Sequence, residues 1–261
     1  MSCEEGGIDI WLIHYDDFND EIMLAELRGL LQDSEREQEP RFYFSDDRKR
    51  YLVTRAMVRT LLSRYASVAP QDWRFVKNAY GRPQIDRRHT EALNLRFNIS
   101  HTRGLIAIGI VRHREIGLDV ENTRTRATST EIADRFFSPT EAAELARMPE
   151  VKRQDGFFEY WTFKESYIKA RGMGLSLSLE KFSFHYPNER EVQISIHPEL
   201  GDAGERWLFW QYRPSPEHLL AVCVERMGDR IPKVVLRRAI PLVGDQIVST
   251  ELLKATACIR H

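Results

Sequence analysis

Cysteine is scarce in this chain of 261 residues. The three cysteines, Cys3, Cys223 and Cys258, are far apart, and none of them lies in a CxxC pair. This spacing excludes the common zinc motifs and a disulfide framework. It suits the reducing cytosol, so we expect a cytoplasmic protein.

Long apolar runs and a strong charge of either sign are also missing. No run approaches eighteen apolar residues, and Glu4 and Glu5 stand near the N-terminus instead of a long apolar segment. We therefore expect neither a membrane partner nor a secretory signal. The net charge of −1 argues against a nucleic-acid partner while allowing a local basic pocket. No P-loop motif GxxxxGK[ST] occurs, which weakens the case for a P-loop nucleotide hydrolase.

The chain does have enough apolar sequence for a sizeable core, with 42% apolar and 30% charged residues. Its length fits one large domain or two small ones. Alternating apolar patterns predict strands, and patterns of period 3.6 predict helices. The predicted strands are 8–14, 73–77, 97–101, 105–111, 115–121 and a meander of 182–186, 192–197, 207–212 and 219–225. The predicted helices are 22–31, 44–65, 132–137, 138–148 and about 155–172, and no pattern is recognisable after Met227.

The helix predicted at about 155–172 carries a carboxylate in its apolar stripe. Glu165 falls between Phe158 and Trp161 on a helical wheel, and Lys169 lies one turn on. A carboxylate among large apolar side chains is unfavourable unless positive charge meets it. That charge is either Lys169 alone or a bound cation, and both alternatives are open at this point.

The predicted strand 115–121 presents a second acidic feature. Gly117, Asp119 and Glu121 share one face, and their two carboxylates repel each other unless a cation or solvent relieves them. An exposed edge is the simpler interpretation, while the missing side chain at Gly117 suggests room for a ligand. Together with Glu165, these carboxylates suit Mg²⁺ with phosphates completing its coordination shell, and Mn²⁺ is a second candidate.

Basic residues supply possible phosphate partners. They are Lys169, His101 at the end of a predicted strand, Arg82 in the turn 80–83, and Arg50 in the second turn of helix 44–65, for which Ser45 is the predicted N-cap. Each has a simpler interpretation when taken alone, as a structural histidine, a turn residue or part of a solvated helix face.

Four motifs occur in a characteristic order. They are NISH at 98–101, IGLDVE at 116–121, FFSPTE at 136–141, and WTFKESYIKA at 161–170 followed by Gly172 and Gly174. In this order and at these separations they resemble the 4′-phosphopantetheinyl transferase superfamily, specifically its surfactin-type (Sfp-like) two-lobed group. The resemblance covers about residues 8–226, and the combination of GxDxE with WxxKESxxK is specific.

The resemblance implies an α+β fold of two similar α+β lobes with pseudo-twofold symmetry and the active site in the cleft between them. The expected division is an N-terminal lobe at 1–113, a C-terminal lobe at 114–227 carrying the metal-binding carboxylates, and a tail at 228–261 of unknown structure. The implied reaction transfers the 4′-phosphopantetheine group of coenzyme A to a serine of an apo acyl or peptidyl carrier protein and releases adenosine 3′,5′-bisphosphate. A non-catalytic module that binds coenzyme A or a carrier protein is the alternative. We expect a monomer.

The resemblance also assigns roles to residues. Asp119, Glu121 and Glu165 are expected to hold Mg²⁺ on the pyrophosphate, and Glu165 is also the candidate base for the carrier serine. Lys169 is expected to neutralise the leaving phosphate, with His101 as the third catalytic residue. The residues expected to contact coenzyme A are Arg50, Gly81, Arg82, Pro83, Asn98, Ser100, His101, Asp119, Lys164, Glu165 and Lys169.

One segment departs from the family pattern. Members often place Lys or Arg before the motif RFY at 41–43 to bind the 3′-phosphate of coenzyme A, but Glu35 and Gln38 occupy the matching positions here. Arg36 or Arg41 are possible substitutes, and a weakened contact with the 3′-phosphate is expected.

Overall fold

The computed structural model of the protein describes residues 6–125, 136–240 and 244–256. Most of the helix predicted at 132–137 lies outside these residues. The helices are α1 (Glu21–Gly29), α2 (Asp33–Gln38), α3 (Ser45–Leu62), α5 (Pro139–Arg147) and α6 (Glu150–Arg171). The strands are β1 (Ile8–Ile13), β2 (Phe75–Lys77), β3 (Pro83–Ile85), β4 (Leu95–Thr102), β5 (Leu105–Arg112), β6 (Ile116–Asn122), β7 (Phe182–His185), β8 (Gln193–Ile196), β9 (Trp207–Ser215), β10 (His218–Glu225), β11 (Val234–Ile240), β12 (Gly244–Ile247) and β13 (Glu251–Ala255).

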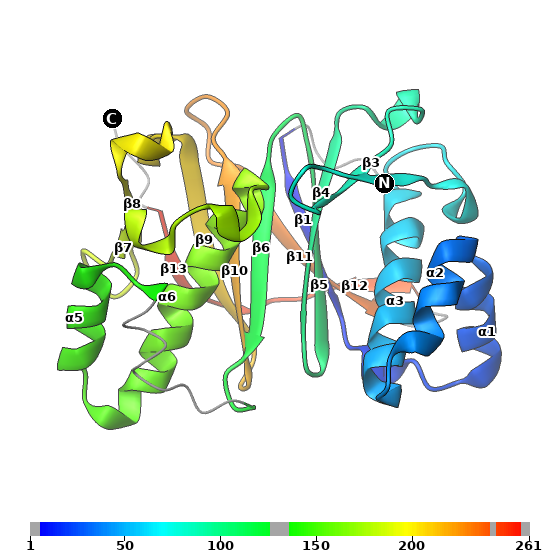
Figure 1. Cartoon of the computed structure of the whole chain (residues 1–261), viewed down its shortest axis with the longest axis horizontal. Helices are drawn as coiled ribbons and strands as arrows, with labels where there is room; N and C mark the ends of the chain where they lie inside the picture. Colours follow the sequence, from blue (N-terminus) through cyan, green and yellow to red (C-terminus); the bar gives the residue numbers. More distant parts are fainter. Residues whose placement is uncertain (1–5, 126–135, 241–243, 257–261) are drawn as a thin grey trace.

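Two sheets stand face to face in the middle of the molecule (Figure 1). One has the strand order β12-β11-β1-β5-β4 and the other β13-β9-β10-β6. Helices α1, α2 and α3 lie outside the first sheet, and α5 and α6 lie outside the second. The chain thus forms the expected pair of α+β lobes, each with one long helix against its sheet.

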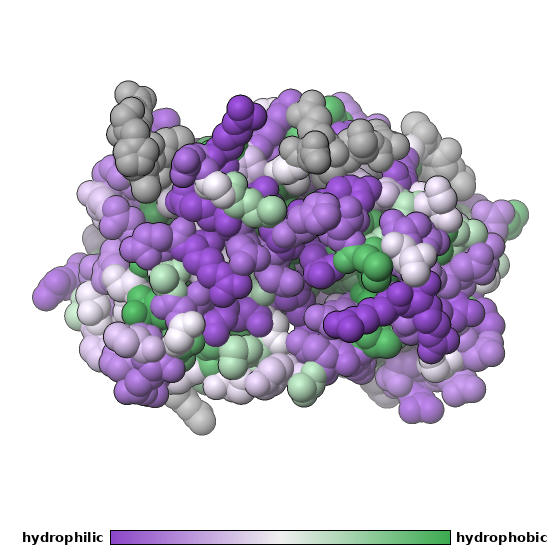
Figure 2. Space-filling view, turned by 90° about the horizontal axis from the view of Figure 1, so that it is seen from above, coloured by the Kyte–Doolittle hydropathy of each residue, from purple (hydrophilic) through white to green (hydrophobic). Residues whose placement is uncertain are grey.

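Three apolar layers follow from this stacking. The middle layer lies between the two sheets. Strand β5 is apolar almost throughout because it has an apolar layer on each of its faces, whereas β6 has one on a single face and is apolar only at alternate residues. The two outer layers lie beneath α3 and α6. Hydrophilic residues cover most of the face seen from above (Figure 2). No helix within the described residues is both long and apolar enough to cross a bilayer.

Gly117 allows α6 to approach β6 very closely. A Cβ atom at this position would lie 2.1 Å from the backbone oxygen of Ser166 and 2.2 Å from the backbone nitrogen of Ala170. The space directly above Gly117 is therefore filled by helix backbone, so the prediction that the missing side chain of Gly117 makes room for a ligand is wrong. Its missing side chain instead brings the carboxylates of β6 next to those of α6.

Several local predictions need correction. Helix α6 begins at Glu150 rather than near Asp155, with Pro149 as its N-cap, and the N-cap of α3 is Phe44 rather than Ser45. Strand β4 continues through His101 to Thr102. The predicted four-stranded meander is two hairpins, because β7 and β8 form a sheet of their own.

The segment after Met227 contributes to both large sheets. Strand β11 pairs in parallel with β1, and β12 extends that sheet. Strand β13 pairs with β9 in the other sheet. A segment without a recognisable pattern thus provides edge strands on both sides of the molecule.

Candidate active site

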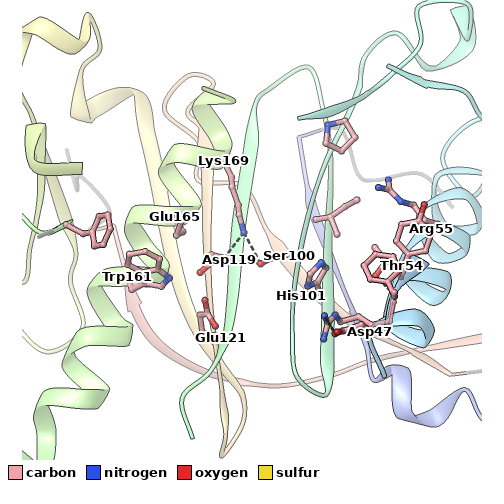
Figure 3. A pocket seen from close by; sticks show the side chains of 16 residues that line it. Asp47, Thr54, Arg55, Ser100, His101, Asp119, Glu121, Trp161, Glu165 and Lys169 are labelled. Carbon is pink, nitrogen blue, oxygen red and sulfur yellow. Dashed lines mark hydrogen bonds and ion pairs between the residues drawn. The ribbon is translucent and has the colours of Figure 1, made fainter. Parts of the chain in front are cut away.

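A cavity of about 610 Å³ lies between α3 and α6, above β4 and β6. Figure 3 shows side chains of α6 on one side of it and side chains of α3 on the other. Its lining includes eight of the predicted site residues, namely Arg50, Pro83, Ser100, His101, Asp119, Glu121, Glu165 and Lys169. These residues come from both lobes.

The floor of the cavity is a seam between two edge strands. Strands β4 and β6 are the last strands of their sheets, and alternate side chains of β4 accept hydrogen bonds from backbone N–H groups of β6. Such bonds satisfy edge donors that have no strand partner on that side. The pairs are Leu118 N to Asn98 Oδ1 (3.0 Å), Val120 N to Ser100 Oγ (3.2 Å) and Asn122 N to Thr102 Oγ1 (3.1 Å).

Asp119 is the centre of the acidic group. Its Oδ1 lies 2.6 Å from Lys169 Nζ and 3.0 Å from the hydroxyl of Ser100, which also accepts a hydrogen bond from Lys169 at 2.9 Å (Figure 3). Its other oxygen, Oδ2, is buried and has no hydrogen-bond partner within the described residues. Lys169 therefore pairs with Asp119, and Glu165 receives no ion pair from it.

The two other carboxylates have no ion-pair partner of their own among the described residues. Burial, followed by repulsion from Asp119, raises the pKa of Glu121 and that of Glu165 to about 7 each. Attraction to Lys169 opposes both shifts but does not cancel them. The site is thus short of positive charge even with Lys169 in place.

These residues fit a hard divalent cation. Asp119 offers an unused buried oxygen, and the carboxylates of Glu121 and Glu165 line the same cavity. Oxygen donors are what Mg²⁺ prefers. In the described ranges, however, no three His, Cys, Asp or Glu side chains already form a group tight enough to hold a metal, so side-chain movement would have to accompany binding.

The opposite wall of the cavity is basic. Arg50 is held by Asp47 (Nη2–Oδ1 2.5 Å), and the guanidinium carbon of Arg55 lies 5.3 Å from the ring centre of Tyr51. Burial, then the nearby charges of Arg50 and Lys169, lower the pKa of His101. The lowered pKa favours the neutral form of His101, so His101 adds little positive charge to this wall.

Arg55 lines the cavity but is not among the residues predicted from the sequence. Its signal is its position four residues after Tyr51, which puts both on the same face of α3. Glu35 pairs with the fully buried Arg59 through one carboxylate oxygen, and its other oxygen lies 3.9 Å from Nε of Arg55. Arg36 pairs with Asp33. None of the four positions considered for the 3′-phosphate, namely Glu35, Arg36, Gln38 and Arg41, lines the cavity.

Four residues predicted to contact coenzyme A do not line the cavity. Lys164 is fully buried, and its Nζ contacts Glu141 Oε2 at 2.8 Å and the backbone oxygens of Leu179 and Phe182. Arg82 pairs with Glu115 (2.9 Å) and donates to the backbone oxygen of Ala170 near the end of α6. The others are Gly81, in the preceding turn, and Asn98, in the seam.

The fold and the cavity together define a class: a two-lobed α+β protein with an acidic centre and a basic wall, suited to a phosphate-bearing substrate. Residues 115–223 match the family model described as the 4′-phosphopantetheinyl transferase superfamily, and residues 20–110 match the model described as 4′-phosphopantetheinyl transferase, N-terminal.

Individual relatives agree with these family models. The chain is 30% identical over 221 residues to the 4′-phosphopantetheinyl transferase HetI of Nostoc sp. (85% of this chain, 89% of the relative). It is 35% identical over 195 residues to the 4′-phosphopantetheinyl transferase Sfp of Bacillus subtilis (75% and 82%). The solved holo-[acyl-carrier-protein] synthase of Thermotoga maritima aligns with 53% of this chain and 84% of its own, with a TM-score of 0.35 and 17% identity, so the assignment rests on the sequence matches.

The chain therefore belongs to the 4′-phosphopantetheinyl transferase superfamily, in its Sfp-like group. It is a 4′-phosphopantetheinyl transferase, an enzyme that attaches phosphopantetheine to a carrier protein.

Proposed function

We propose that coenzyme A binds in the cavity between α3 and α6 and that its phosphopantetheine arm is transferred there to the serine hydroxyl of an acyl or peptidyl carrier protein. The observation that carries this proposal is the meeting of both lobes at Asp119, where Lys169 and Ser100 hold one carboxylate oxygen and leave the other unused. A basic wall faces this centre across a cavity large enough for a nucleotide-sized ligand.

Asp119, Glu121 and Glu165 are the residues that would hold Mg²⁺, or Mn²⁺ in its place. When bound, the ion would neutralise pyrophosphate oxygens of coenzyme A. Lys169 stabilises the charge that develops on the departing adenosine 3′,5′-bisphosphate, because its amine already lies at the acidic centre. Neutral His101 donates a hydrogen bond to a phosphate oxygen.

Glu165 is the proposed base for the serine proton. A pKa of about 7 is close to the optimum for proton transfer near neutral pH. Coordination to a cation would lower that pKa, so its two roles compete. The proton moves to Glu165 directly or through one water, the serine oxygen bonds to the β-phosphorus, and the bond to the departing bisphosphate breaks.

Intact-mass measurement of apo carrier proteins incubated with the enzyme, coenzyme A and Mg²⁺ tests this proposal. We expect one phosphopantetheinyl group per carrier, and loss of the product with Asp119→Asn. The exposed residue Asp72 provides the matched control, Asp72→Asn, which should transfer normally. If no carrier of either kind gains mass, the chain is a non-catalytic binding module.

A further inference from the structure

A second cavity, of about 410 Å³, lies where the chain crosses between the two sheets. One crossing is the turn from β5 to β6, and another is the link from β10 to β11. Both crossings contribute cations to the cavity, and none of its lining residues within the described ranges is Asp or Glu. The cations are Arg112, Arg114, Arg230 and Lys233.

Arg114 is the buried member of this group. It is only 6% exposed, and its Nε and Nη1 atoms are buried without a hydrogen-bond partner in the described structure. A buried guanidinium normally has partners for its N–H groups, because leaving them unpaired is unfavourable. This unsatisfied side chain is the independent sign that the cavity takes a ligand.

The two carboxylates near Arg114 in the sequence or the fold form ion pairs with other arginines. Glu115 forms ion pairs with Arg82 (2.9 Å) and Arg96 (3.5 Å). Glu225 pairs with Arg206 (2.9 Å) and accepts a hydrogen bond from the backbone of Glu115. Neither carboxylate forms an ion pair with Arg114, although both line a neighbouring cavity with it, and the charge of Glu225 opposes the lowering of the Arg114 pKa by burial.

The neighbouring cations also have no carboxylate partner among the described residues. Arg112 donates to Asn94 Oδ1 (2.9 Å) and to the backbone oxygen of Tyr65 (2.6 Å), which are both neutral acceptors. Within the described ranges, Arg230 and Lys233 belong to none of the ion pairs. The described lining of the cavity therefore combines four cationic side chains with no carboxylate among them.

We propose that this cavity binds a multiply charged phosphate-type anion, which bridges Arg114 on one crossing and Arg230 and Lys233 on the other. Arginine matches the oxygen geometry of a phosphate group, and several cations favour a polyanion over chloride. The bound anion would tie the two crossings together and stabilise the junction between the lobes. None of the predicted active-site residues lines this cavity.

The test measures thermal unfolding of the full chain in metal-free buffer as inorganic phosphate or pyrophosphate is titrated against chloride at constant ionic strength. We expect either probe to raise the melting temperature, and Arg114→Gln to weaken the apparent affinity at least tenfold. Comparing the two probes distinguishes a single phosphate group from a linked pair. The exposed residue Arg88 provides a matched control, Arg88→Gln, which should behave as the wild type.

Two further variants distinguish anion binding in this cavity from anion binding in the active-site cavity. Lys169→Gln should keep the response, because Lys169 belongs to the active-site cavity; a lost response would place the anion there and overturn the proposal. Lys233→Gln should weaken binding in the same way as Arg114→Gln, which covers the case in which the Arg114 variant fails to fold. An unchanged affinity in Lys233→Gln or in a folded Arg114→Gln also overturns the proposal. Glu4 and Glu5 precede Gly6, which lines the cavity, so a variant with both glutamates replaced by Gln is measured as well. Phosphate binding by this variant but not by the wild type would overturn the proposal.

Discussion

At the scale of single residues, charge balance around Asp119 governs the site. Lys169 compensates one carboxylate, while the pKa values of Glu121 and Glu165 both rise to about 7. Lys164 precedes Lys169 on the same helix, but it is fully buried and forms an ion pair with Glu141 inside the C-terminal lobe. Neighbouring charged residues of one helix thus have different tasks, because only one of the two lysines faces the cavity.

The raised pKa of Glu165 predicts how stability depends on pH without metal. Its folded-state pKa of about 7 exceeds the ordinary value of 4.5, so the folded chain holds the proton more tightly. The contribution of Glu165 to the free energy of unfolding therefore falls as pH rises from about 4.5 to 7. Glu165→Gln should lose less stability than the wild type over this interval.

Urea unfolding at pH 5 and pH 7.5, with and without Mg²⁺, measures this difference. Mg²⁺ should stabilise the wild type at pH 7.5 and do so less in Glu165→Gln. If the free energy of unfolding depends on pH with the same slope in both proteins, burial and repulsion do not raise the pKa of Glu165.

The basic wall of α3 predicts which residue senses the 3′-phosphate of coenzyme A. Arg55 lines the cavity, while Arg36 does not. Arg55→Gln should therefore weaken binding of coenzyme A by about 1.5–3 kcal/mol, the typical value for a charge-assisted hydrogen bond, and affect 3′-dephospho-coenzyme A far less. Calorimetry with both ligands measures this, with Arg36→Gln as the control. Equal losses for both ligands would place Arg55 elsewhere on the substrate.

At the scale of elements, the site depends on how two edge strands and one helix meet. The seam from β4 to β6 sets the register of the lobes through three side-chain acceptors. Helix α6 then rests its backbone on Gly117 of β6. The distance between the carboxylates of β6 and Glu165 therefore follows from backbone packing.

Gly117→Ala should disturb this packing. The added Cβ would meet backbone atoms near 2.1 Å, so α6 must shift, and we expect about 1–3 kcal/mol of destabilisation, as for overpacked cores, with strongly reduced transfer. Gly29→Ala in α1 is the matched control, because nothing lies within 4 Å of its added Cβ, and it should be neutral or stabilising. Thermal unfolding and the transfer assay compare the variants. An active, fully stable Gly117→Ala would contradict the close approach.

At the scale of the whole molecule, the C-terminal segment connects the lobes. Strand β11 pairs with β1 on the side opposite β5, and β13 pairs with β9 at the end of the other sheet. The same chain thus crosses from one sheet to the other after β10 and again after β12. These crossings join the two lobes and so hold the two walls of the active-site cavity together.

Removing residues 249–261 should therefore destabilise the protein without touching the active-site residues. Strand β9 would become an exposed edge with unpaired backbone groups, which favours aggregation. We expect a lower melting temperature and concentration-dependent aggregation, measured by calorimetry and light scattering. As a control, Ile247→Ser changes an exposed side chain of the neighbouring strand and should have little effect. Unchanged stability after truncation would mean that β13 contributes nothing to the second sheet.

The sequence by itself determined the family, the α+β pattern, both long helices and the acidic motifs, because periodicity and motif spacing are local properties. Only the tertiary structure decided that Lys169 pairs with Asp119, that Lys164 is buried, that Gly117 receives helix backbone and that Arg55 faces the cavity. It also decided that the tail supplies strands to both sheets. Each of these depends on contacts between segments far apart in the chain, where burial and competing partners determine which charge meets which.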